Sequence, residues 1–123
     1  MRIREGPTSD GIDLDSRKHA RRRRGSRLLA LVAAGDRDEP LVELYDRYAK
    51  RVYGLGLRLL GDRGLAEDLV QETFLRLWRS APRFDPDRAT VRTFLFTIAR
   101  RAAVDLWRRR RDRIEAGYEA EPV

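Results

Sequence analysis

The chain has 123 residues, which is enough for one small domain with a tail. Hydrophobic residues make up 41% of it and charged residues 38%, a combination that favours helices with one buried face and charged exposed faces. The absence of cysteine excludes a disulfide scaffold and a cysteine-ligated metal site. No apolar run approaches a membrane span and no signal-peptide pattern opens the chain, so we expect a cytoplasmic protein without membrane insertion.

The net charge of +7 is concentrated in two basic blocks that flank a neutral stretch. Residues 1–27 carry nine basic and four acidic side chains, and residues 100–113 carry seven basic and two acidic ones. Residues 28–99 carry eleven of each sign. Because like charges repel, such blocks need solvent or an anionic partner such as nucleic acid.

The first segment, residues 1–26, shows almost no apolar periodicity and is expected to be a mostly disordered basic arm. It ends in four consecutive arginines, residues 21–24. Two interpretations of this run have about equal weight: a solvated tail, or an accessory contact to DNA or RNA.

Apolar spacing then predicts helices over residues 27–34, 41–60, 65–80 and from 91 to about 113. Gly35 and Gly61 end the first two, Asp36 or Asp38 caps the second with Pro40 in its first turn, and Thr90 caps the fourth. The buried stripe predicted for the second helix is Leu41, Leu44, Tyr45, Tyr48, Val52, Leu55, Gly56 and Leu59. The stripe predicted for the third is Ala66, Leu69, Val70, Thr73, Phe74 and Leu77.

No strand-like alternation occurs, so the expected fold is all-α, a compact bundle of about four helices over residues 27–113. Residues 114–123 are interpreted as the start of an interdomain linker. No catalytic constellation is visible, because the single histidine, His19, lies in the basic arm without a partner. The acids Glu67, Asp68 and Glu72 lack a histidine or a second acidic helix, so the sequence predicts no metal site, no cofactor and no enzyme.

The third predicted helix has an unusual outward face. Its members lie three or four residues apart and therefore on one side of the helix: Asp68, Gln71, Glu72, Leu75 and Arg79. A solvated helix rarely needs a leucine in such a position, and acceptors around an exposed apolar residue suit a basic partner helix. An ordinary charged face with one stray leucine remains the alternative.

Two sequence segments, in the order in which they follow one another along the chain, carry a family resemblance. The third helix contains AEDLVQETFLRLW, and the segment after it is FDPDRATVRTFLFTIARRAAVDLWRRRR. Together with the preceding helix they resemble region 2 of the extracytoplasmic-function (ECF) sigma factors over residues 27–113. The resemblance implies that the first string docks on the paired clamp helices of the RNA polymerase β′ subunit. It implies that the second captures the unpaired non-template strand of the −10 promoter element.

The resemblance assigns the face defined above to polymerase binding and a second set to DNA: Phe84, Asp85, Arg88, Thr90, Thr93, Phe94, Thr97, Arg100, Arg101, Arg108 and Arg109. Phe94 stands where many members have tryptophan. Arg101 stands where many have asparagine, so base-specific contact is not implied there. From the residues alone, Phe94 is expected to lie partly in the core, Trp78 and Trp107 to pack at the bundle edge, and Asp105 to pair with a nearby arginine.

The expected partners are the polymerase core, promoter DNA at the −10 element, and an anti-sigma factor that covers the same faces. A second helical domain for the −35 element is expected to be missing after residue 113. Two rivals remain: a small helical regulator that binds duplex DNA, which needs a short recognition helix after a tight turn, and a pure protein-interaction module.

Overall fold

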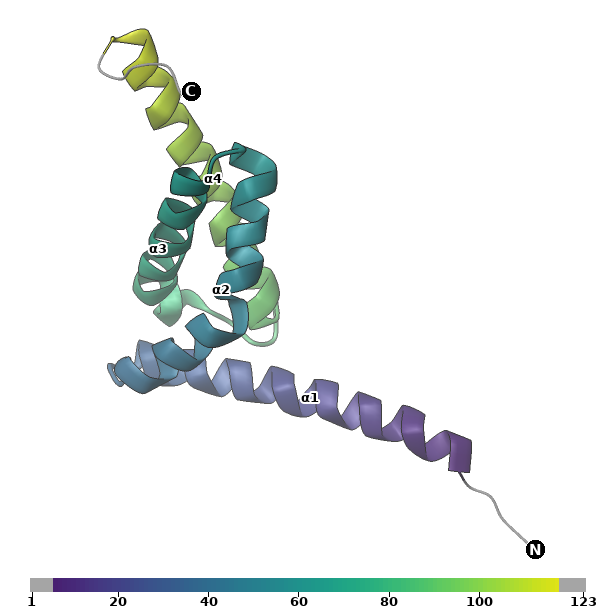
Figure 1. Ribbon diagram of the computed structural model, residues 1–123. Coiled ribbons are helices and arrows are strands. Elements are labelled where there is room, and N and C mark those ends of the chain that lie inside the picture. Colours follow the sequence, from purple (N-terminus) through teal and green to yellow (C-terminus); the bar gives the residue numbers. More distant parts are fainter. Residues whose placement is uncertain (1–5, 118–123) are drawn as a thin grey trace, which may run out of the picture.

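The computed structural model describes the backbone of residues 6–117 and the side chains of residues 14–117. Over this range the elements are four α-helices and one short 3₁₀ helix: α1 (Gly6–Ala33), α2 (Asp38–Leu60), α3 (Arg63–Ser80), η1 (Ala81–Arg83) and α4 (Val91–Glu115). No strand occurs between residues 6 and 117, and the all-α prediction is confirmed. Helices α2, α3 and α4 stand side by side, while α1 crosses one end of them and projects outward (Figure 1).

Helix ends follow local chemistry in most places. Gly35 and Gly61 adopt φ of 101° and 66° after α1 and α2, a conformation that favours glycine. The Thr90 side chain accepts a hydrogen bond from the Thr93 amide at 3.2 Å, as expected for a cap. The predicted cap of α2 is wrong: Arg37 occupies that position without a side-chain bond, and Asp38 is already helical. There its negative charge faces the positive end of the helix dipole.

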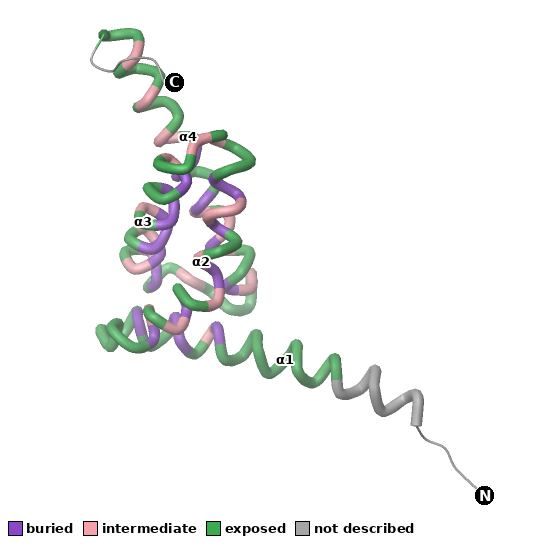
Figure 2. Tube along the Cα trace, viewed as in Figure 1, coloured by how far each residue is buried: buried purple, intermediate pink, exposed green. Residues whose placement is uncertain are grey.

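The core lies between the facing sides of α2, α3 and α4, and the end of α1 closes it (Figure 2). All six residues of the predicted α3 stripe are buried, which confirms that helix and its register. The α2 stripe is only partly right, because Tyr45 and Leu59 are 47% and 52% exposed. Gly56 brings α2 close to α3: a Cβ on it would lie 2.9 Å from the Ala66 Cα.

The basic arm differs from its expectation, because a single helix begins at Gly6 instead of near residue 27. Arginine and lysine are good helix formers, and the last turns of α1 are anchored to α2. Arg24 donates to both carboxylate oxygens of Glu43, at 2.6 and 2.9 Å, and Arg47 donates to the Arg21 carbonyl at 3.2 Å. The arm's residues 1–5 and the linker's residues 118–123 lie outside the described part.

Helix α4 ends two residues later than predicted and extends past α2 and α3 (Figure 1). Asp105 pairs with Arg76 of α3 at 2.8 Å, as expected. Trp107 does not pack into the bundle; it is 48% exposed, with the Arg111 guanidinium 4.9 Å from its ring centre. Trp78 is half-buried, and the Arg37 guanidinium lies 4.5 Å from its ring centre. No described helix is long and apolar enough to cross a membrane.

Candidate functional site

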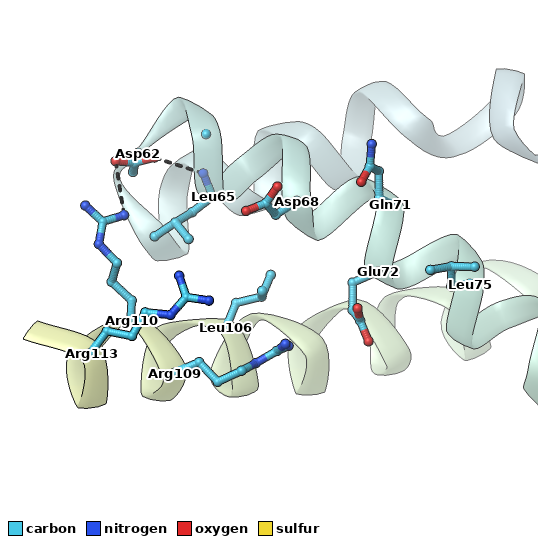
Figure 3. A pocket seen from close by; sticks show the side chains of 11 residues that line it. Asp62, Leu65, Asp68, Gln71, Glu72, Leu75, Leu106, Arg109, Arg110 and Arg113 are labelled. Atoms are coloured by element: carbon cyan, nitrogen blue, oxygen red, sulfur yellow. Dashed lines mark hydrogen bonds and ion pairs between the residues drawn. The ribbon is translucent and has the colours of Figure 1, made fainter. Parts of the chain in front are cut away.

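One face of α3 is left open by the bundle, and we name it the docking face: Asp68, Gln71, Glu72, Leu75 and Arg79. Leu75 is 42% exposed, and all but the half-buried Glu72 are exposed. Beside this face a hollow of about 360 Å³ separates α3 from α4 (Figure 3). Every residue of the docking face except Arg79 lines the hollow.

The α4 side of this hollow is basic, which sequence reasoning did not predict. Arg109, Arg110 and Arg113 line it opposite the acids of α3 (Figure 3). Arg110 Nη1 lies 3.6 Å from the carboxylate of Asp62, the residue that caps α3. The hollow therefore carries charges of both signs, and acid–base pairing neutralises part of them.

Arg76 joins the docking face to α4. Its guanidinium donates to Glu72 at 2.9 Å and to Asp105 at 2.8 Å. Burial lowers the pKa of Arg76, but the hydrogen bonds to Glu72 and Asp105 outweigh it, and the net pKa is raised. Glu72 is thus already engaged within the chain, whereas Asp68 and Gln71 have no ion pair or side-chain hydrogen bond to any described residue.

Gln71 also borders a second hollow, between α2 and α3, that continues the docking face. Tyr45 and Tyr53 of α2 line it, and the Tyr45 ring packs 5.0 Å from that of Phe74. The sequence placed Tyr45 in the buried stripe because its spacing fits. Periodicity alone does not reveal which edge of an apolar stripe a neighbouring helix leaves uncovered.

The loop between η1 and α4 is held by an aromatic pair and a turn. The rings of Phe84 and Phe94 lie 5.3 Å apart at 59°, and both side chains are half-buried against the core, as expected for Phe94. Asp85 Oδ1 accepts from the Asp87 amide at 2.9 Å, which fixes an Asx-type turn. Arg88 projects outward, 3.9 Å from Asp85, with 87% of its side chain exposed.

The predicted DNA residues of α4 do not all lie on one face. Most share its exposed face: Thr93, Thr97, Arg100, Arg101 and Arg108. Thr97 Oγ1 donates to the Thr93 carbonyl at 2.9 Å, so its hydroxyl hydrogen is already committed. Arg109 points elsewhere, because it lines the hollow beside Asp68 and Glu72 (Figure 3). The structure therefore groups Arg109 with the docking face.

A second basic surface lies where α1, α2 and α4 meet, and we name it the basic groove. It consists of two adjoining hollows of about 870 and 400 Å³ that share Arg22, Arg51, Thr90 and Arg92. Its cationic lining residues come from three helices: Lys18, Arg21, Arg22, Arg51, Arg58, Arg92 and Arg100. No acidic side chain lines either hollow within residues 14–117.

Sequence reasoning missed Arg51, Arg58 and Arg92 because each is isolated from the basic blocks along the chain. One signal was present: Arg51 and Arg58 are seven residues apart, and so lie on the same side of a helix. What the sequence could not give is the crossing of α1 that brings Arg22 to them.

Residues 44–113 match the family model described as Sigma-70 region 2. This stretch covers most of α2, all of α3 and the loop, and nearly all of α4. The chain belongs to the sigma-70 region 2 family. It contains a region 2 domain of the ECF sigma-factor type.

Curated relatives agree with this assignment. The chain is 41% identical over 100 residues to "ECF RNA polymerase sigma factor SigK" of Mycobacterium tuberculosis (strain H37Rv) and of Mycobacterium bovis (strain BCG / Pasteur 1173P2). The aligned stretch covers 81% of this chain and 47% of each relative. It is 44% identical over 78 residues to the protein of that name in Mycobacterium sp. (strain KMS), covering 63% and 40%. The chain thus spans about half the length of these relatives. No solved structure matches it.

Proposed function

We propose that this region 2 domain acts in transcription initiation, docking on the RNA polymerase core and holding the melted −10 strand. The observation that carries the proposal is the pair of open surfaces on the family-matched elements. The docking face on α3 presents an exposed leucine among polar groups, and the loop with α4 presents cations and half-buried aromatic rings.

The docking face supports binding to a basic partner helix, and the β′ clamp helices are the proposed partner. Leu75 offers apolar area at the centre of the face, and Asp68 and Gln71 offer acceptors that no described residue occupies. Tyr45 extends the face onto α2, and exposed aromatic residues are enriched at protein interfaces. An anti-sigma factor that covers the same face would compete with polymerase.

The loop and α4 support single-strand binding. Cationic surfaces combined with aromatic rings hold unpaired strands, and a base can be bound on its pairing edge only after it leaves the stack. Phe84, Asp85, Arg88 and Thr90 at the loop, and Thr93, Phe94, Thr97, Arg100, Arg101 and Arg108 on α4, are the proposed contacts. Opening of the duplex would then be driven by the binding of the exposed strand.

The duplex-binding regulator is less well supported. Within the described range η1 and an Asx-type turn separate α3 from α4, and α4 is 25 residues long. A helix-turn-helix needs a tight turn and a short recognition helix instead.

Pull-down of core polymerase tests the docking proposal. Gln71→Ala combined with Leu75→Asp changes two exposed side chains and leaves the Glu72–Arg76 pair intact. Retention of the double variant should fall by about tenfold or more, because a charge replaces the central apolar contact. Leu59→Asp, at an exposed leucine of α2 outside the docking face, is the matched control and should be retained normally. Equal retention of a folded double variant would contradict the proposal.

A further inference from the structure

We propose that the basic groove binds the phosphates of a single nucleic-acid strand, with α1 as one of its walls. The inference rests on the proposed function and extends it to residues that are not among the proposed strand contacts, three of them outside the family match. Lys18, Arg21 and Arg22 precede residue 44, and Arg51 and Arg58 belong to α2 instead of the loop or α4.

The charge of the groove favours an anionic ligand. Seven cationic side chains line it and no acid does, within the part of the chain whose side chains are described. Arg22, Arg51 and Arg92 also have no ion pair with any described residue. Clustered like charges repel one another, and a strand with regularly spaced phosphates removes this repulsion by displacing counterions. The N-terminal end of α4 adds partial positive charge at Thr90.

The four consecutive arginines have different surroundings, which a solvated tail would not produce. Arg21 and Arg22 line the groove, Arg24 binds Glu43 of α2, and Arg23 is exposed without lining either hollow. The Arg24–Glu43 pair and the bond from Arg47 to the Arg21 carbonyl hold this part of α1 against α2. The wall of the groove is therefore positioned before any ligand arrives.

The path of the groove favours a strand over a compact anion. Its larger hollow includes Thr90, Thr93 and Arg100, which are proposed strand contacts, and Phe96, whose half-buried ring can support a base. From there the surface continues over Arg92 and Arg51 to Arg22 and Lys18. A strand held at the loop can thus enter the groove without leaving the protein.

Length-dependent binding of oligothymidine tests the inference. The probes are strands of about 6 and about 14 nucleotides, since the shorter fits the loop and α4 alone. Arg22→Ala/Arg51→Ala should weaken binding of the longer probe by about tenfold and make its salt slope less negative by roughly 1.4, from about 0.7 per phosphate contact. Binding of the shorter probe should change little.

Arg23→Ala/Arg63→Ala is the matched control, because it removes the same charge from exposed residues that do not line the groove. Equal losses in both double variants would overturn the inference, as would undiminished binding of the longer probe by a folded groove variant. Competition by a poly-glutamate peptide of equal charge, as strong as by the longer strand, would also overturn it in favour of an acidic protein. If wild type binds only the longer probe and the groove variant loses it, the proposed loop contact fails while the groove stands.

Discussion

The docking face and the basic groove both have arginines beside them, but the arginines differ in whether they are paired with acids. Beside the docking face, Arg76 and Arg110 are paired with acids of the same chain, and they hold α4 against α3. In the groove, Arg22, Arg51 and Arg92 have no such partner among the described residues. Arginine content alone therefore does not distinguish the two surfaces. The local balance of cations and acids does.

The strongest test of this difference between the two surfaces is to reverse one charge in each. Arg92→Glu should weaken binding of the longer oligothymidine by more than roughly tenfold, because it removes a phosphate contact and adds repulsion. Arg109→Glu, beside Asp68 and Glu72, should change it less than about threefold. Fluorescence anisotropy at two salt concentrations measures both. A larger loss for Arg109→Glu would return that residue to the DNA-binding set that the sequence predicted.

A second test concerns the paired arginines. Arg76→Met keeps the aliphatic stem but removes the bonds to Glu72 and Asp105, so the free energy of unfolding should fall by about 1 kcal/mol. Urea denaturation measures the change. Arg79→Met, at an exposed arginine of the same helix with no ion pair to a described residue, is the control and should shift the midpoint far less. Equal midpoints for the two variants would mean that Arg76 does not tie the helices together.

The smallest expected effect concerns the anchor of α1. The hydrogen bond from Arg24 lowers the pKa of Glu43. The stabilisation that the Arg24–Glu43 pair gives to the packing of α1 on α2 is therefore present above the ordinary glutamate pKa. It is lost as the pH falls through the lowered pKa. Amide exchange in residues 14–24 should therefore accelerate, relative to its intrinsic rate, once the pH falls well below the ordinary glutamate pKa. Glu43→Gln should show the faster exchange already at neutral pH. If neither the drop in pH nor Glu43→Gln changed the exchange rates, the Arg24–Glu43 pair would not be what holds α1 against α2.

The sequence predicted the bundle well because α2, α3 and α4 have apolar stripes that only a helix places on one side. The docking face on α3 could be predicted for the same reason, since Leu75 breaks the polar pattern on the side opposite the stripe. The basic groove could not be predicted from the sequence. Its arginines come from three helices, and those of α1 join the others only because α1 crosses the end of α2 (Figure 1). Only the last turns of α1 were predicted, because residues 14–24 are all exposed and carry no apolar periodicity.

Gly56 sets the separation between the two surfaces. Helix α3 carries the docking face, and α2 carries Arg51 and Arg58 of the groove. At their contact a single hydrogen atom stands where any other residue would place a carbon 2.9 Å from the Ala66 Cα. A side chain there would push α2 and α3 apart, and with them the basic groove and the docking face. The spacing of two distant surfaces is therefore encoded by the absence of a side chain that neither surface contains.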